Sequence, residues 1–297
     1  KNLPPDWLEL TTHRLAIYSE KQAKREFLTE FEALYQQNNT QTSALSQLPT
    51  AYDYIRLGHP LSSVLEWTIA KLNHLEAENI ISFSSATMPI MAVLRTNAFE
   101  GKHARILHTG ELPVLLDADV VRRINGYQFE LEQIEDMAAI PAFDGSTILV
   151  TQQDELTELN LPANVDFFVG LYANLCSIIA IHGEHNASYI SEIQHVRRRE
   201  SIAMPPADSL VALQQLTEMP VIAPRPARHP NNKMLVQDEI RRITGSNVEA
   251  LLASSGLSMQ YAIVMGLIHD AMKNHPGKPI KIVVPPNCYG GTNDQAR

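Results

Sequence analysis

The sequence predicts an α/β protein with a mostly parallel sheet covered by helices on both faces. Short apolar runs alternate with helix-like segments of roughly three to four turns, which is the order typical of parallel sheets. Some runs are β-branched and almost uninterrupted, as in Ile280 to Val284, and such runs fit strands buried on both sides. The regular short strands and frequent turn glycines of an antiparallel sandwich are missing from the sequence.

The first part of the chain contains a full alternation of these elements. Apolar residues at near-helical spacing predict a long polar helix over about 13–37, followed by a loop. Further helices are expected over 62–75, from Thr87, and near 130–138, 188–199 and 207–216. The strands expected between them are 79–83, 104–108, 147–151 and 165–169.

A proline-rich stretch, "MPVIAPRPARHPNN", interrupts this pattern and predicts an extended connector. We place a domain boundary there, with one domain over 1–222 and the beginning of a second over 223–297. After the connector a helix over 233–243, a strand over 249–253, a helix over 257–273 and a strand over 280–284 are expected. "SSG" at 254–256 then matches "SSA" at 84–86 in the same order of elements. We interpret this match as an internal duplication.

Composition excludes several classes of function. The net charge of −9 disfavours a nucleic-acid surface, and we interpret the basic run Arg197 to Arg199 as a solvated helix face. No apolar run approaches the roughly 20 residues that span a bilayer. Cys176 and Cys288 lie far apart in apolar surroundings, so we expect free thiols and a cytoplasmic setting. No metal site is expected, because "HGEH" at 182–185 lacks the spacing of zinc-binding motifs.

The turn Ser254-Ser255-Gly256 leads directly into a predicted helix. The free N–H groups and the dipole of a helix N-terminus attract anions, and Gly256 allows close approach of a phosphate. Small residues also occur at such turns without any ligand, so the turn alone leaves both interpretations open. Tyr289 follows the next predicted strand at its carboxyl end, where α/β sheets bind ligands, and its ring could stack on a planar group.

These motifs resemble a known family. "SSGLSMQ" followed by "CYGGTN", and "YIRLGHP" ahead of "LEWTIAKLNHLEAENIISFSSA", resemble the pyridoxal-phosphate enzymes of cysteine and methionine metabolism, the cystathionine γ-synthase and γ-lyase group. The resemblance implies the fold type I transferase architecture and pyridoxal 5'-phosphate as cofactor. The first domain would be a degenerate copy, followed by the start of a second copy.

The resemblance also implies roles for individual residues. Ser255, Gly256 and Leu257 would form the phosphate turn, with backbone N–H groups as donors, and Tyr289 would stack on the pyridine ring. Tyr54 and Arg56 match a pair that reaches across a dimer interface to the phosphate. In the second copy Arg228 and Asn231 match, but Pro226 replaces the tyrosine.

The sequence departs from the family at the groups that do the chemistry. The family needs a lysine that bonds to the cofactor and an aspartate beside the pyridine nitrogen. Asn174 stands where the first copy would carry that lysine, Ala86 replaces the turn glycine, and "HTGELPVLL" replaces Tyr-Gly-Gly-Thr. Lys273, Lys278 and Lys281 lie in the wrong elements to serve instead. We therefore expect a longer polypeptide, a homo-oligomer or a complementary chain to complete the site.

Three classes of function remain open. The first is a pyridoxal-phosphate enzyme that eliminates or replaces a group at the β or γ carbon of a sulfur amino acid or an activated homoserine. The second is a catalytically inactive scaffold or regulatory subunit of the same fold, which Asn174 favours. The third is an unrelated α/β binding protein. We expect a small amino-acid substrate and no nucleic-acid or membrane partner.

Overall fold

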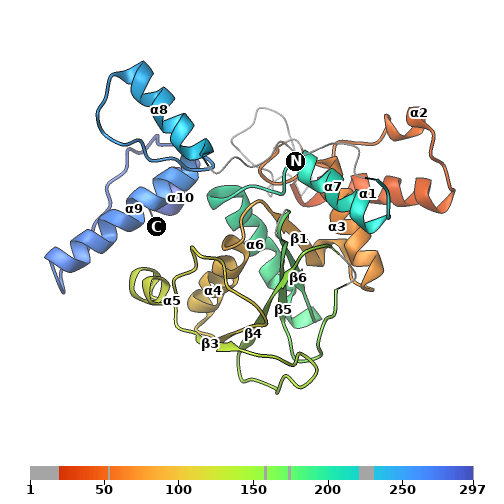
Figure 1. The fold of residues 1–297 in the computed structure, drawn as a ribbon, viewed down its shortest axis with the longest axis horizontal. Coiled ribbons are helices and arrows are strands. Elements are labelled where there is room, and N and C mark those ends of the chain that lie inside the picture. Colours follow the sequence, from red (N-terminus) through yellow and green to blue (C-terminus); the bar gives the residue numbers. More distant parts are fainter. Residues whose placement is uncertain (1–19, 53, 157–158, 173–174, 221–230, 297) are drawn as a thin grey trace, which may run out of the picture.

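The computed structural model describes residues 20–52, 54–156, 159–172, 175–220 and 231–296 (Figure 1). In this part of the chain six strands form one sheet, in the order β1-β6-β5-β4-β2-β3. Strands β3, β2, β4 and β5 are parallel, and β6 runs antiparallel to both β5 and β1. This arrangement confirms the predicted mostly parallel α/β class. The strands are β1 (Ile80–Phe83), β2 (Ala104–His108), β3 (Glu130–Gln133), β4 (Ser146–Gln153), β5 (Phe167–Tyr172) and β6 (Cys176–Ile181).

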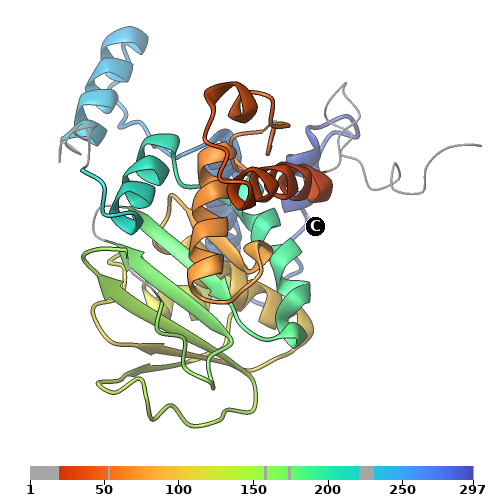
Figure 2. The same ribbon diagram turned by 90° about the vertical axis from the view of Figure 1, so that its right-hand side faces the viewer.

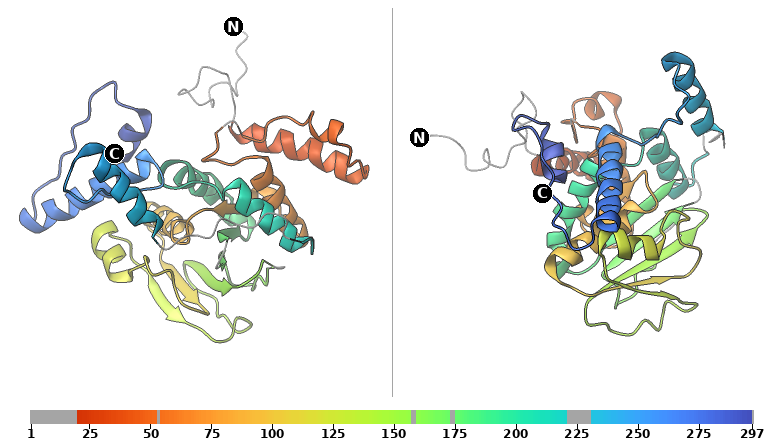
Figure 3. Two further views of the ribbon diagram at one scale, coloured as in Figure 1. Left: turned by 45° about the horizontal axis from the view of Figure 1, so that its top comes forward. Right: turned by 90° about the vertical axis from the view of Figure 1, so that its left-hand side faces the viewer.

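Helices cover both faces of the sheet. Apolar side chains of α4 and α6 pack on one face and those of α3 and α7 on the other. Figure 2 shows α1 lying across α3, and Figure 3 shows α9 on the outer side of the α4–α6 layer. The helices are α1 (Glu20–Gln36), α2 (Thr42–Leu45), α3 (Pro60–Leu72), α4 (Met88–Glu100), α5 (Ala118–Val120), α6 (Ala187–Glu200), α7 (Pro206–Leu216), α8 (Asn232–Thr244), α9 (Gly256–Asn274) and α10 (Gly290–Gln295), with short turns η2 (Ala77–Asn79), η3 (Val121–Asn125) and η4 (Glu184–Asn186). None of these helices is both long and apolar enough to pass through a bilayer.

The central strands are buried on both sides, as their apolar runs predict. On β4, Ile148 and Val150 face the α4–α6 layer, and Leu149 faces the α3–α7 layer. On β5, Phe167 and Phe168 divide between the two faces in the same way. Adjacent side chains of a strand point to opposite faces, so an uninterrupted apolar run is required here.

Local sequence fixes where the covering helices begin and end. His59 and Ser62 form a reciprocal capping box at the start of α3, and Pro60 occupies the first helical position. Gly101, with φ +65°, ends α4 in the left-handed conformation that glycine adopts without strain.

Residues 130–138 form no helix, contrary to the sequence-based prediction. Residues 130–133 are instead β3, an edge strand paired in parallel with β2. All four of its side chains are exposed. Because an edge strand outside the helical layers buries no side chain, it tolerates the polar composition that suggests a surface helix.

Two predicted strands, 249–253 and 280–284, are also wrong in this structure. Both segments lie outside helices and strands, and their side chains are mostly exposed. In the first part of the chain, β1 is held by β6 and β2 by β3 and β4. The described residues contain no strand in the equivalent places beside 249–253 and 280–284. A backbone without a pairing partner cannot form a ladder, whatever its side chains favour.

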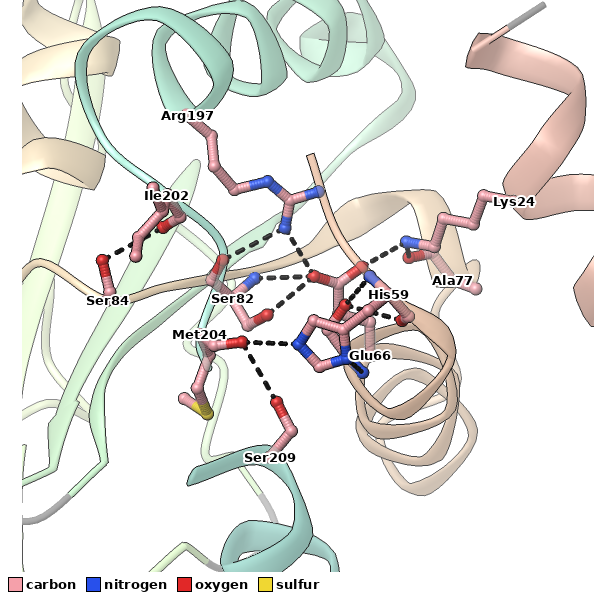
Figure 4. Close-up of polar contacts among 11 residues, drawn as sticks. Lys24, His59, Glu66, Ala77, Ser82, Ser84, Arg197, Ile202, Met204 and Ser209 are labelled. Carbon is pink, nitrogen blue, oxygen red and sulfur yellow. Dashed lines mark hydrogen bonds and ion pairs between the residues drawn. The ribbon is translucent and has the colours of Figure 1, made fainter. Parts of the chain in front are cut away.

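A buried carboxylate connects four elements (Figure 4). One oxygen of Glu66 on α3 lies 2.6 Å from Lys24 Nζ on α1, and the other lies 2.7 Å from Arg197 Nη1 on α6. Ser82 on β1 donates to the same carboxylate through its backbone N–H and its hydroxyl. Burial raises the pKa of Glu66, but the attraction of Lys24 and Arg197 outweighs it and the pKa falls to about 2.

The same network corrects the interpretation of the basic run 197–199. Arg197 is 0% exposed and Arg198 is also buried, so this run is not a solvated helix face. The partner that pairs with Arg197 lies 131 residues away in the sequence, on another helix. Local sequence therefore carries no sign that this arginine is buried.

We predict that Glu66→Ala destabilises the protein by about 3–5 kcal/mol, because it leaves Lys24 and Arg197 buried without their counter-ion. Urea unfolding followed by circular dichroism measures this change. Asp238→Ala, which removes the exposed pair with Arg241 on α8, is the control and has a much smaller effect. Equal effects of the two substitutions would contradict the assigned role of Glu66.

The depressed pKa of Glu66 also predicts a pH dependence. Its folded-state pKa of about 2 lies below the ordinary 4.5, so ionised Glu66 stabilises the fold fully above pH 4.5, and this stabilisation is lost as the pH falls towards 2. Urea midpoints measured across this range should fall more steeply for the native protein than for Glu66→Gln, which cannot titrate there. Parallel curves would show that Glu66 is not the titrating group.

Candidate functional site

The opening turn of α9 presents free backbone donors. Ser255 caps the helix, and its hydroxyl accepts a hydrogen bond from the Ser258 N–H at 3.1 Å. Within the described chain, the N–H groups of Gly256 and Leu257 have no acceptor. Gly256 is exposed, and a Cβ added there would meet nothing within 4 Å. A 19-residue helix therefore begins with two backbone donors that have no acceptor among the described residues; Gly256 is exposed, whereas Leu257 is buried.

Tyr289 lies near Leu257 in this turn, with Gly291 between the two side chains. A Cβ added to Gly291 would come within 2.7 Å of the Leu257 side chain and 2.9 Å of the Tyr289 ring, so glycine is what allows this contact. Two hydrogen bonds hold α10 against α9, from Thr292 Oγ1 to Gln260 Oε1 at 2.8 Å and from Gln295 Nε2 to the Leu257 carbonyl at 3.1 Å. The Tyr289 side chain remains 48% exposed.

Tyr54 and Arg56 contact the end of α6 and the residues that follow it, which also contact the start of α9. The Arg56 guanidinium lies 4.7 Å above the Tyr54 ring, and the Ala203 N–H donates to the Arg56 carbonyl at 3.0 Å. From the other side, Ser258 Oγ on α9 donates to the Glu200 carbonyl at 2.8 Å. The pair and the α9 turn thus contact one short segment, residues 198–203.

The matching turn of the first part of the chain has a different donor arrangement. Ser85 Oγ accepts from the Met88 N–H at 3.2 Å, which repeats the bond between Ser255 and Ser258 at the same spacing. Ser85 Oγ also accepts from the Thr87 N–H at 3.3 Å. The Thr87 N–H, which corresponds to the Leu257 N–H of α9, is therefore hydrogen-bonded within its own turn.

A cavity of about 520 Å³ lies between the two turns. It is lined by residues 84–88, 113–115, 200, 201 and 254, and it adjoins a second cavity of about 340 Å³ whose lining includes Glu111, Gln152 and Cys176. The described residues of both linings include no lysine or arginine. The carboxylate of Glu200 is paired with Arg95 on α4.

The lysines of residues 231–296 lie on the surface. Lys233, Lys273, Lys278 and Lys281 of residues 231–296 are all exposed. Asn174, Pro226 and Arg228 lie outside the described residues, and Asn231 precedes α8. Cys176 and Cys288 are half-buried, and neither forms a disulfide within the described chain.

A polar contact that the sequence does not predict attaches α9 to the sheet-bearing part. Asn125 Nδ2 on η3 donates to the hydroxyl of Tyr261 at 3.0 Å, and Arg95 and Tyr127 lie close enough to influence that phenol. Burial is the largest cause that raises the pKa of Tyr261 and Tyr127. Nothing in the sequence around Tyr261 distinguishes this contact from ordinary helix packing.

No family model and no curated protein matches this chain. Among solved structures, metB from Corynebacterium glutamicum aligns at 14% identity and a TM-score of 0.38, over 64% of this chain and 58% of that one. Cystathionine gamma-lyase from Lactobacillus plantarum, complexed with L-serine, aligns at 16% and 0.36, over 66% and 62%. The chain thus spans about three fifths of these proteins. At such TM-scores the likeness identifies no family, and the fold class rests on the sheet itself.

Gly291→Ala is predicted to separate Tyr289 from α9, because the added methyl group would overlap the Leu257 side chain and the Tyr289 ring. Backbone amides of the first turn of α9 and of α10 should exchange with deuterium faster in this variant. Gly290→Ala is the matched control, since its methyl group would meet nothing within 4 Å in the same short helix. Identical exchange in both variants would show that the contact across Gly291 does not hold the turn.

Proposed function

We propose that the protein binds pyridoxal 5'-phosphate at the opening turn of α9, as part of an enzyme of sulfur amino-acid metabolism. The reaction would be elimination or replacement at the β or γ carbon. The observation that carries the proposal is the pair of N–H groups at Gly256 and Leu257 that have no acceptor among the described residues, with Tyr289 beside Leu257. A phosphate needs such donors, and a planar ring attached to it needs an adjacent aromatic side chain.

The residues present fit the phosphate and the ring of this cofactor. The N–H groups of Gly256 and Leu257, together with the dipole of α9, would hold the phosphate, while Ser255 keeps the turn in shape. Tyr289 would cover one face of the ring. When bound, pyridoxal phosphate supplies an electron sink for negative charge that develops on a substrate carbon. Tyr54 and Arg56 would add a hydroxyl and a positive charge from the segment around 198–203.

We further propose that the chain contains two related units, 1–222 and 223–297. The repeated serine-to-amide bond at the start of α4 and α9 supports this division, as does the repeated order of helix, "SS" turn and helix. In this proposal the first unit lends Tyr54 and Arg56 to the site of the second. The lysine that bonds to the cofactor would come from a polypeptide segment other than those described.

An inactive scaffold of the same fold is the second candidate. The observation that favours it is at α4, where Ser85 satisfies the Thr87 and Met88 N–H groups and Ala86 replaces the turn glycine. The first unit would then hold no phosphate and would serve only to support the second.

Calorimetric titration with pyridoxal 5'-phosphate, pyridoxal and inorganic phosphate tests the proposed site. Pyridoxal phosphate should bind more tightly than pyridoxal, because only the former reaches the α9 donors through its phosphate. Gly256→Glu should weaken this binding at least about tenfold, since a carboxylate would occupy the donors. Tyr289→Ala should weaken it about three- to tenfold, the range expected for loss of one aromatic contact.

Gly266→Glu is the matched control. Gly266 is exposed in the same helix, a Cβ there would meet nothing within 4 Å, and it lies ten residues beyond the opening turn. Binding that is unaffected by Gly256→Glu, or equally weakened by Gly266→Glu, would rule out the site. A visible absorption band that borohydride abolishes would favour the enzyme, and binding without such a band would favour the scaffold.

A further inference from the structure

A further cavity lies between α1, the last turn of α3 and η2, where α1 crosses α3 (Figure 2). Its volume is about 570 Å³, which is within the usual range of sites for small organic molecules. Its lining includes no residue of α9 or α10. A ligand bound there would therefore be independent of pyridoxal phosphate at the α9 turn.

Part of this lining is apolar. Leu28 of α1 and two residues of α3, Trp67 and Ala70, line the cavity and are buried. Leu75 and Ile190 are half-buried and extend the apolar surface. Such a surface can remove a short hydrocarbon chain from water.

The charged part of the lining has more carboxylates than cations. The carboxylates are those of Glu32, Glu76 and Glu78, and the cations are Arg25 and Lys71. Lys71 Nζ lies 2.5 Å from Glu32 Oε1, whereas Arg25 Nε lies 3.9 Å from Glu78 Oε1 and the Arg25 side chain is 73% exposed. Glu76 makes no hydrogen bond or ion pair within the described chain. One carboxylate is therefore unpaired and another is only loosely paired.

The same lining already holds two ammonium groups of the chain itself. Lys24 Nζ donates to the carbonyl of Ala77, a lining residue, at 2.9 Å. Lys71 Nζ lies 5.7 Å from the centroid of the Trp67 ring, and its hydrogen bond to Glu32 is the largest cause that raises the pKa of Lys71. The last turn of α3 also brings the negative end of the helix dipole to the cavity. These contacts show that the lining stabilises ammonium ions.

We propose that this cavity binds a primary aliphatic amine in its ammonium form. The ammonium group pairs with Glu76 and Glu78, and the hydrocarbon chain packs on Leu28, Trp67 and Leu75. An anionic ligand would meet an excess of carboxylates and the negative end of α3. A neutral ligand of the same length would gain the apolar contacts without the charge.

Pentylamine, pentanol and pentanoate share a chain length and differ in charge, so they test the proposal on the full chain at pH 7. Pentylamine is protonated at this pH, as a lysine side chain is. A Trp7→Phe background leaves Trp67 as the only tryptophan, and its fluorescence then reports binding at the cavity. Pentylamine should change this fluorescence in a saturable way, with at least about tenfold higher affinity than pentanol or pentanoate.

Glu76→Gln and Glu78→Gln should each weaken pentylamine binding by about two- to fivefold, which is the range for loss of an exposed ion pair. Glu26→Gln is the matched control. Glu26 is exposed on α1, next to Arg25 in the sequence, and it is not part of the lining. This variant should bind pentylamine with unchanged affinity.

Several results would overturn the proposal. Equal affinity for pentylamine and pentanol would show that only the apolar surface binds, and tighter binding of pentanoate would assign the cavity to anions. Unchanged affinity in both Glu76→Gln and Glu78→Gln, or an equal loss in Glu26→Gln, would place the amine elsewhere. A Trp67 fluorescence that does not respond to pentylamine would mean that the cavity takes no amine.

Discussion

The burial of Glu66 is the constraint on which the rest of the structure depends. Its carboxylate must be paired, and Arg197 provides one of the two positive charges that pair with it. That requirement fixes which side of α6 faces the sheet. Arg198, the next residue, then lies over the Tyr54 ring, and the carbonyl of Glu200 at the end of α6 accepts a hydrogen bond from Ser258. A buried ion pair in the first part of the chain thereby positions the segment 198–203, which α9 and the Tyr54–Arg56 pair each contact.

The two serine turns, at 84–86 and 254–256, have similar sequences but different hydrogen bonding. Both turns make the same bond from a serine hydroxyl to the amide three residues later. At α9 the helix begins directly after Ser255, and the amides of Gly256 and Leu257 have no acceptor among the described residues. At α4 the helix begins two residues later in the corresponding sequence, and the serine takes an additional amide. The position of the first helical residue, more than the identity of the serine, decides whether donors remain for a ligand.

Much of the fold could be predicted from sequence, and the exceptions have physical reasons. β1, β2, β4 and β5 were predictable because their apolar runs are long enough for two-sided burial, and α9 was predictable from its cap and length. The pairing of Glu66 with Arg197 was not, because both partners lie in helical segments that look ordinary in isolation. Tyr289 approaches Leu257 because Gly291 has no side chain, which no pattern in the sequence reveals, and the stacking role of Tyr289 stays a prediction. The segments 249–253 and 280–284 have strand-forming side chains, yet a strand exists only where a neighbour completes its ladder.

The hydroxyl of Ser85 has a consequence for how this chain can change over evolutionary time. A helix whose opening amides are satisfied by its own serine needs no bound anion to remain folded. Mutations that abolish anion binding at that turn would therefore leave the stability of the fold unchanged. Selection for stability alone would not restore such binding. At the Gly256 turn, two amides need solvent or an anion as hydrogen-bond acceptor. The conformation of that turn therefore depends on which of the two is bound there.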